Sequence, residues 1–110
     1  MITADLLRGY TDAVILRRIA EEDSYGYQIN RRISEKSRGG LELKEATLYT
    51  AFRRLEASGC IQSYWGDEST GARRRYYRLT DLGSLKLEED RELWKETKEL
   101  LDLLIGGEEE

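Results

Sequence analysis

Basic and hydroxyl side chains are concentrated in two stretches of the chain, residues 44–54 and residues 73–75. Arginine, lysine, threonine and tyrosine donate hydrogen bonds to phosphate oxygens and to the edges of DNA bases. In the first stretch, Leu48, Phe52 and Leu55 recur at helical spacing, so they share one face of an amphipathic helix. The opposite face carries arginines, hydroxyls and alanines, and it would fit a DNA major groove. An ordinary surface helix with one basic side would show the same pattern.

The residue types that commonly perform catalysis or hold metals are scarce. The chain of 110 residues contains one cysteine, Cys60, and no histidine. A lone thiol without histidine lacks its usual activating base, and a zinc site built from cysteine and histidine is excluded. The acidic runs at residues 88–90 and 108–110 are typical of solvated surfaces. The sequence therefore predicts a protein that is not an enzyme and that uses no cofactor or metal.

Length and charge bound the remaining choices. The chain is long enough for one domain, and it contains no apolar run that could cross a bilayer and no signal-peptide pattern. We therefore expect a cytoplasmic protein without a membrane partner. The net charge of −4 is divided unevenly, because residues 1–78 hold 14 basic against 11 acidic side chains and residues 79–110 hold 4 against 11. The mildly basic first part is compatible with a nucleic-acid partner.

Hydrophobic periodicity predicts the elements that position the basic stretches. A first helix is expected over residues 3–21 and a second over about residues 25–37, with Ser24 as the N-cap of the second. Residues 41–43 are expected to form one short edge strand at most. The basic helix follows over residues 44–59 and ends at a glycine, which is common just after a helix.

A β-hairpin is expected after the basic helix, with strands over residues 60–65 and 73–79. Side chains alternate along a strand, so Arg73 and Arg75 share one face and Arg74 takes the other. Three helices followed by a hairpin is the order of a winged helix, in which the hairpin is the wing. A solvated edge strand protected by its arginines is the alternative interpretation of this segment.

A long final helix is expected over residues 81–105, capped by Thr80 and Asp81. Its apolar residues recur at heptad spacing, and a domain of this size cannot bury such a seam, so we expect pairing with a second copy. The residues expected in this dimer seam are Leu87, Leu93, Thr97, Leu100, Leu101 and Leu104. The predicted fold is mainly α with a small β-hairpin, organised as a winged-helix DNA-binding domain over residues 1–79, a dimerisation helix over 80–105 and a disordered acidic tail over 106–110.

Three motifs, in this order and spacing, resemble the PadR family of transcriptional regulators: Tyr25-Gly26-Tyr27, Ala46-Thr47-Leu48-Tyr49 and Arg74-Arg75-Tyr76-Tyr77-Arg78-Leu79-Thr80. The similarity covers about residues 5–105. The stretches Glu45–Thr50 and Ser63–Ser69 are similar to the small, multidrug-sensing lactococcal branch of that family. The resemblance implies a homodimeric repressor whose final helix packs against the partner protomer.

We expect the third helix of each protomer to enter the major groove of operator DNA while the wing follows the flanking backbone. The residues expected to contact base edges or nearby phosphates are Thr47, Tyr49 and Thr50. The residues expected to hold phosphates are Lys44, Arg53, Arg54, Arg73, Arg74 and Arg75, together with Tyr25 and Tyr27 from the second helix. A winged-helix module that binds another protein, without sensing a ligand, is the alternative function.

The resemblance also implies a ligand site. In multidrug-sensing members, a tryptophan of the final helix lines a hydrophobic cavity at the dimer centre and stacks on planar aromatic molecules, and Trp94 falls at the matching place. The residues expected to line this site are Leu6, Tyr10, Ala13, Val14, Asp90, Trp94 and Lys98. Ligand binding would then weaken operator binding, and the amine of Lys98 would not favour a cationic ligand. A tryptophan that only fills the dimer core is the alternative.

Overall fold

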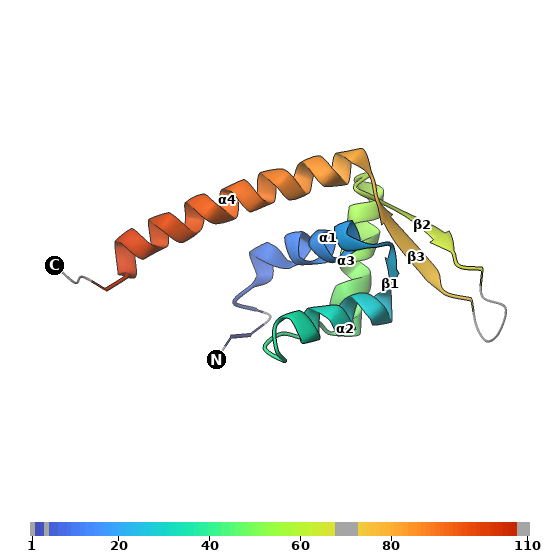
Figure 1. The fold of residues 1–110 in the computed structure, drawn as a ribbon, viewed down its shortest axis with the longest axis horizontal. Helices are drawn as coiled ribbons and strands as arrows, with labels where there is room; N and C mark the ends of the chain where they lie inside the picture. Colours follow the sequence, from blue (N-terminus) through green and yellow to red (C-terminus); the bar gives the residue numbers. More distant parts are fainter. Residues whose placement is uncertain (1, 4, 68–72, 108–110) are drawn as a thin grey trace.

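The computed structural model describes residues 2–3, 5–67 and 73–107. It contains three packed helices, a small antiparallel sheet and a long last helix that extends away from them (Figure 1). In chain order the elements are the 3-10 turn η1 (Arg8–Tyr10), α1 (Thr11–Glu21), β1 (Ser24–Tyr25), α2 (Gly26–Lys36), α3 (Glu45–Ala57), β2 (Ile61–Trp65), β3 (Arg75–Leu79) and α4 (Asp81–Ile105). The predicted fold class, a winged helix followed by a long C-terminal helix, is confirmed.

The sheet has the strand order β1-β3-β2, and both pairings are antiparallel. The predicted hairpin is formed by β2 and β3, in a register that pairs Ile61 with Leu79 and Trp65 with Arg75. The outer part of its loop, residues 68–72, lies outside the described residues. The third strand, β1, comes from the start of the second predicted helix, and its Ser24 pairs with Tyr77.

The prediction that Ser24 caps the second helix was wrong. The N-cap of α2 is Tyr25, which makes no side-chain capping hydrogen bond. Ser24 is fully buried in β1 instead, where its hydroxyl donates to the carbonyl oxygen of Glu22 at 2.9 Å and accepts from the Arg32 guanidinium at 2.8 Å. Ser24 lies one residue before the N-cap, and its hydroxyl is already engaged by Glu22 and Arg32, so it does not cap α2.

The first helix differs from its prediction, and residues 41–43 stay within theirs, which allowed one edge strand at most. The first helix begins at Thr11 and not at residue 3, because residues 8–10 form a 3-10 turn around Gly9, a weak helix former. Residues 41–43 form no strand. The side-chain amide of Asn30 takes the place of a neighbouring strand there, donating to the Leu43 carbonyl oxygen at 2.7 Å and accepting from the Leu43 N–H at 3.1 Å.

The hydrophobic core lies where α1, α2 and α3 meet the sheet. Phe52 of α3 stacks on Tyr77 of β3 with ring centroids 4.1 Å apart, and Ile15, Leu16 and Ile29 are fully buried around them. Helix α1 contacts α2, α3, β3 and α4, which explains why its apolar stripe is wider than one packing partner requires. Helix α1 therefore contacts both α3 and α4.

The predicted threonine cap at the start of α4 is confirmed, and the same residue also ties the helix to Gly59. The Thr80 hydroxyl accepts from the Gly83 N–H at 3.0 Å as the N-cap, and donates to the Gly59 carbonyl oxygen at 2.6 Å. Gly83 packs so closely that an added Cβ would collide with the Cys60 carbonyl oxygen and lie 2.8 Å from Leu79 Cδ1. Only glycine fits there without a shift, so this contact sets the direction in which α4 leaves the domain.

Beyond its first turns, α4 exposes most of the predicted dimer seam. Leu100 is 55% exposed and Leu104 is 68% exposed, and Leu93 and Leu101 are exposed as well. Leu87 differs, because it is only 7% exposed and belongs to the core of its own chain. Its assignment to the dimer seam was therefore wrong, since α4 still packs on α1 at that position. Residues 108–110 of the predicted tail lie outside the described residues. Within the described residues, no helix is both long and apolar enough to span a membrane.

Candidate nucleic-acid interface and ligand cavity

The inner face of α3 is buried and its outer face is open to solvent. Leu48, Phe52 and Leu55 are buried as predicted, together with Ala51. The exposed residues on α3 and its N-terminal flank include Lys44, Ala46, Thr47, Tyr49, Thr50, Arg53 and Arg54. Helix α3 contacts α2 and β2, and β2 pairs with β3, so the residues predicted to bind DNA lie on or next to elements that these contacts connect (Figure 1). We call the eleven of them the basic face: Tyr25, Tyr27, Lys44, Thr47, Tyr49, Thr50, Arg53, Arg54, Arg73, Arg74 and Arg75.

Tyr49 lies at the edge of the basic face and is partly held by the fold. Its ring meets the Phe52 ring edge-on, with centroids 5.3 Å apart. Its phenol end packs against Gly26, where an added Cβ would lie 2.9 Å from Tyr49 Cζ. A side chain at Gly26 would therefore displace Tyr49, which explains the use of glycine at the start of α2. Tyr27, one residue later, is exposed.

The two arginines of α3 differ in their partners. Arg53 donates to Thr50 Oγ1 of the same helix at 3.3 Å, which is a long hydrogen bond. Arg54 forms an ion pair with Asp12 in the first turn of α1. Arg53 is therefore the more available of the two for a phosphate. Sequence reasoning treated them as equivalent because Asp12 is far away along the chain.

The three arginines at the hairpin take the alternating sides that the sequence predicts. Arg73 and Arg75 both lie over the Trp65 ring, with guanidinium carbons 5.2 and 6.0 Å from its centroid. Arg74 lies over the Tyr25 ring at 4.8 Å. Such cation–π contacts help to hold a guanidinium group in place. The hairpin thus presents positive charge on both of its sides.

A row of tyrosines supports the Arg74 side of the hairpin. Tyr76 meets Tyr25 edge-on at 5.3 Å and stacks on Tyr64 at 5.7 Å between ring centroids. The Tyr64 hydroxyl donates to Asp23 Oδ2 at 2.6 Å. This hydrogen bond, which only the protonated phenol can make, raises the pKa of Tyr64 to about 12. Tyr25 is therefore held by aromatic contacts, beneath an arginine, at the junction of α2 and the wing.

Glu56, in the last turn of α3, ties this helix to the wing. Its Oε2 accepts from the Ser63 N–H at 3.2 Å and from the Ser63 hydroxyl at 2.6 Å. Arg75 donates to the same hydroxyl at 2.8 Å and reaches Glu56 Oε1 at 3.5 Å. Sequence reasoning missed this residue, although an acid at the end of a basic helix, opposite a basic strand, is a usable signal. The three side chains fix the wing relative to α3.

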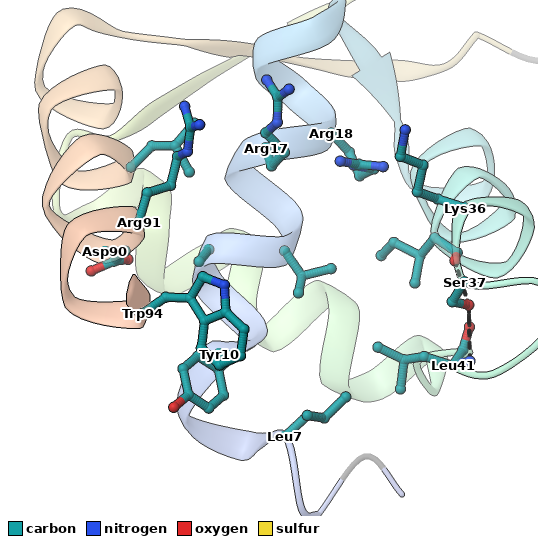
Figure 2. A pocket seen from close by; sticks show the side chains of 14 residues that line it. Leu7, Tyr10, Arg17, Arg18, Lys36, Ser37, Leu41, Asp90, Arg91 and Trp94 are labelled. Carbon is teal, nitrogen blue, oxygen red and sulfur yellow. Dashed lines mark hydrogen bonds between the residues drawn. The ribbon is translucent and has the colours of Figure 1, made fainter. Parts of the chain in front are cut away.

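A cavity of about 460 Å³ lies between α1, α2 and the first half of α4 (Figure 2). Trp94 forms part of its wall and meets the Tyr10 ring edge-on, with centroids 5.6 Å apart. Five of the predicted ligand residues line it: Tyr10, Ala13, Val14, Asp90 and Trp94. Leu6 and Lys98 do not. A volume of this size is typical of small-molecule sites, which measure roughly 300–1,000 Å³.

The two exceptions have simple geometric reasons. Leu6 is exposed, and its neighbour Leu7 lines the cavity, because the chain enters α1 through a 3-10 turn. The Lys98 amine lies over the Trp94 ring at 5.7 Å, outside the cavity wall. Residues of one chain line the cavity, and its predicted place at the centre of a dimer stays a prediction. Four basic residues that border it, Arg17, Arg18, Lys36 and Arg91, were not predicted at all.

Comparison with known proteins agrees with this architecture. Residues 15–89 match the Transcriptional regulator PadR-like family. An uncharacterized protein of Lysinibacillus sphaericus is 46% identical over 107 residues, which cover 97% of this chain and 98% of that protein. The structure of a transcriptional regulator from Clostridium thermocellum is 42% identical, with a TM-score of 0.85 over 92% of this chain and 98% of that one. A PadR family transcription regulator from Clostridium difficile is 35% identical, with a TM-score of 0.80 over 89% of this chain and 100% of that one. With three helices, a wing and a long last helix in common with these regulators, the chain belongs to the PadR-like family of transcriptional regulators.

Proposed function

We propose that this protein is a homodimeric repressor that binds operator DNA through the basic face and is released by a small hydrophobic or aromatic molecule beside Trp94. The observation that carries the proposal is the outer face of α3, where Thr47, Thr50 and Arg53 are exposed on a helix whose last turn is tied to the wing through Glu56. Hydroxyls near the N-terminus of a helix suit base edges and phosphates, and guanidinium groups farther along suit the phosphate backbone. The wing arginines then hold the flanking phosphates and set the register.

The exposed side of α4 supports a homodimer. Leu93, Leu100, Leu101 and Leu104 leave a large apolar strip in water on a single chain. A second copy of the same helix would cover the strip and give a two-fold axis. The two copies of α3 would then reach successive major grooves, roughly 34 Å apart along the DNA.

Helix α1 supports a route from ligand to DNA. Its N-terminal end carries Tyr10, which contacts Trp94 of α4, and Asp12, which pairs with Arg54 of α3. A molecule that enters the cavity between α1 and α4 has to contact Tyr10 or Trp94. A shift of α1 would move Asp12 and Arg54 together, and it would change the spacing of the two reading helices in the dimer.

The decisive experiment is fluorescence anisotropy of a labelled duplex that covers the DNA upstream of the protein's own gene. Wild type is compared with the double variant Arg53→Ala, Arg74→Ala and with the control Lys95→Ala, on the side of α4 away from the seam. We expect the double variant to bind more weakly and to flatten the plot of log affinity against log salt by about one unit for each phosphate that it no longer neutralises. The control should match wild type.

Equal binding by wild type and the double variant would contradict the proposal. Absence of binding beyond that of random DNA would favour a protein partner, for which Tyr64 and Trp65, exposed on the hairpin, offer aromatic contact surface. The ligand step is tested in the same assay, because saturating ligand has to lower operator affinity if the two sites are coupled.

A further inference from the structure

A second, smaller hollow lies between the start of α1 and the flank of α3 that faces it. It measures about 330 Å³, and we call it the α1–α3 hollow. The polar side chains in its wall are those of Arg8, Thr11, Thr47, Thr50 and Arg54, and the other two lining residues are alanines. No acid lines it, and each of these polar side chains can donate a hydrogen bond. Such a set of donors is suited to an anion with several oxygen atoms.

Each guanidinium group of the hollow is held by an acid that does not line it. Arg8 forms an ion pair with Asp5, three residues earlier, and Arg54 forms one with Asp12 of α1. Three of these four side chains are more than half exposed, and ion pairs in water contribute only about 0–1 kcal/mol. A guanidinium group also has five N–H donors, more than one carboxylate uses. Both arginines can therefore donate to an anion in the hollow.

The 3-10 turn η1 places two of the donors. Leu7 and Tyr10 line the cavity beside Trp94, whereas Arg8 and Thr11 line the α1–α3 hollow. A 3-10 turn has three residues per turn, so residues three apart in the chain share a side. Leu7 and Tyr10 are one such pair, and Arg8 and Thr11 are the other. The turn therefore presents an apolar side to the cavity and a polar, basic side to α3.

The hollow lies on the flank of α3 opposite the wing. Glu56, which binds the wing through Ser63, follows Arg54 by two residues, a rotation of about 200° around the helix. Thr47 precedes Arg54 by about two full turns, so these two residues share the flank that faces the hollow. A helix in the major groove, which is about 12 Å wide, has one sugar–phosphate backbone along each flank. With the wing on one side, the hollow faces the other backbone.

We propose that the α1–α3 hollow binds one phosphate of the DNA backbone, on the side of α3 opposite the wing. Arg8 and Arg54 donate guanidinium N–H groups to its non-bridging oxygens, and Thr11 and Thr47 donate their hydroxyls. Arg8 and Thr11 lie outside the basic face, so η1 and the start of α1 join the DNA-binding surface. The inference rests on the proposed function, because it adds a contact to the same DNA. A phosphate contact positions the protein and reads no base, so it acts on every DNA sequence.

Fluorescence anisotropy with the operator duplex and with a random duplex tests the contact. Arg8→Ala should lower both affinities by the same factor, about fivefold, and flatten the plot of log affinity against log salt by about one unit. Arg8→Lys keeps the charge and should recover most of the loss, whereas Lys95→Ala, which removes one positive charge from α4, should match wild type. Asp5→Asn frees Arg8 and should raise both affinities. It carries the test if thermal unfolding shows that Arg8→Ala does not fold.

Duplexes that carry a single methylphosphonate locate the phosphate, because this linkage replaces a charged oxygen with a methyl group. The linkage is moved along both strands of the operator. At one position in each half-site, wild type and Lys95→Ala should lose about fivefold in affinity, while Arg8→Ala loses almost nothing further. This position should differ from the one at which Arg74→Ala becomes insensitive. If Arg8→Ala loses as much affinity as wild type at every position, the proposal is overturned.

A free phosphate ion has the same chemistry as a backbone phosphate. Inorganic phosphate is therefore titrated into the protein without DNA, and the Arg8 Nε–H is followed by nuclear magnetic resonance. Saturation below about 1 mM, together with unchanged DNA binding by Arg8→Ala, would assign the hollow to a free anion and overturn the proposal.

Failure of this inference can be told from failure of the proposed function. If wild type binds the operator and Arg8→Ala binds it equally well, the function stands and this phosphate contact is lost. If wild type binds random DNA as tightly as the operator, and Arg8→Ala weakens both, the contact stands and the repressor function is lost. A wild type that binds no DNA would contradict both.

Discussion

Asp12, in the first turn of α1, forms an ion pair with Arg54 of α3, the helix proposed to read DNA. The same end of α1 carries Tyr10, which contacts Trp94 in the wall of the cavity. The ion pair therefore connects α1, which lines the cavity, to α3, the helix proposed to read DNA. Asp12 also competes with DNA phosphate for the Arg54 guanidinium. We therefore expect the strength of this ion pair to affect both the affinity for operator DNA and the change in that affinity when ligand binds.

Replacing Asp12 with Asn should release Arg54. We expect operator affinity to rise roughly threefold, because an exposed pair of this kind holds its arginine only weakly and the freed charge can bind phosphate. The loss of operator affinity caused by a saturating planar aromatic ligand should shrink at the same time. Anisotropy titrations with and without the ligand measure both effects, and Glu35→Gln, which makes the same change of charge on α2, is the control. A ligand response of full size in Asp12→Asn would rule out coupling through this pair.

Glu56→Gln tests how the wing is positioned. The variant loses the carboxylate that binds Ser63 and Arg75, but it also removes a negative charge close to DNA. Affinity for a random duplex should therefore hold or rise, while the ratio of operator affinity to random affinity falls about fivefold, which corresponds to about 1 kcal/mol. Anisotropy with the two duplexes gives this ratio. A ratio equal to that of wild type would show that Glu56 does not position the wing.

Gly83→Ala should destabilise the protein by about 2 kcal/mol, because the added methyl group collides with the Cys60 carbonyl oxygen and crowds Leu79. Urea unfolding followed by circular dichroism measures the change in the free energy of unfolding. Ser84→Ala, at the next and exposed position of α4, should change it by no more than about 0.5 kcal/mol. Equal stability of the two variants would mean that the start of α4 can shift away from the hairpin freely.

The dimer seam is tested by the double variant Leu100→Glu, Leu104→Glu. Carboxylates facing each other across a two-fold axis repel, so the variant should sediment as a monomer where wild type sediments as a dimer. Lys95→Glu, on the other side of α4, should remain dimeric. If wild type itself is monomeric in analytical ultracentrifugation, the apolar strip on α4 does not mediate self-association.

The Tyr64 hydroxyl should ionise at an unusually high pH. Its pKa is raised from 10.0 to about 12, chiefly by the hydrogen bond to Asp23. Because the folded pKa is the higher one, the stabilising contribution is complete below pH 10 and is lost as the pH rises through about 12. Absorbance of the phenolate, compared between wild type and Tyr64→Phe, assigns the late step. In the variant Asp23→Asn, the pH at which this phenolate forms should fall back toward the ordinary tyrosine pKa. If that pH does not change, Asp23 is not the cause of the raised pKa.

Strong local signals explain what the sequence predicted well. The last helix begins and ends where predicted because a threonine cap and a pair of glycines mark its two ends. The arginines around the wing take alternating sides as expected, although β3 begins at Arg75 and not at residue 73. The inner face of α3 was identified correctly because Leu48, Phe52 and Leu55 recur at helical spacing over a full 13-residue helix.

The features that sequence reasoning missed depend on contacts between distant residues. Strand β1 is two residues long, too short to show any periodicity, and it exists only because β3 lies beside it. Arg17 and Lys36 both border the cavity, but they belong to two different helices, and no local sequence pattern indicates that they lie close to the same cavity. Leu87 falls in the heptad pattern, yet it faces α1. Heptad spacing shows which residues share one side of a helix, but it does not show which of them pack within the same chain and which pack on a second copy.

The clamp between Asn30 and the Leu43 backbone has a consequence for engineering the chain. These two hydrogen bonds fasten Leu43, two residues before α3, to the middle of α2, so we expect the position of α3 to depend little on the length of the segment over residues 38–42. Extra residues introduced between Gly39 and Gly40 would form a surface bulge upstream of the clamp and leave α3 in register. The same residues introduced after Leu43 would turn α3 about its axis and rotate Arg53 out of the exposed face. A peptide tag placed between the two glycines is therefore compatible with a working DNA-reading helix.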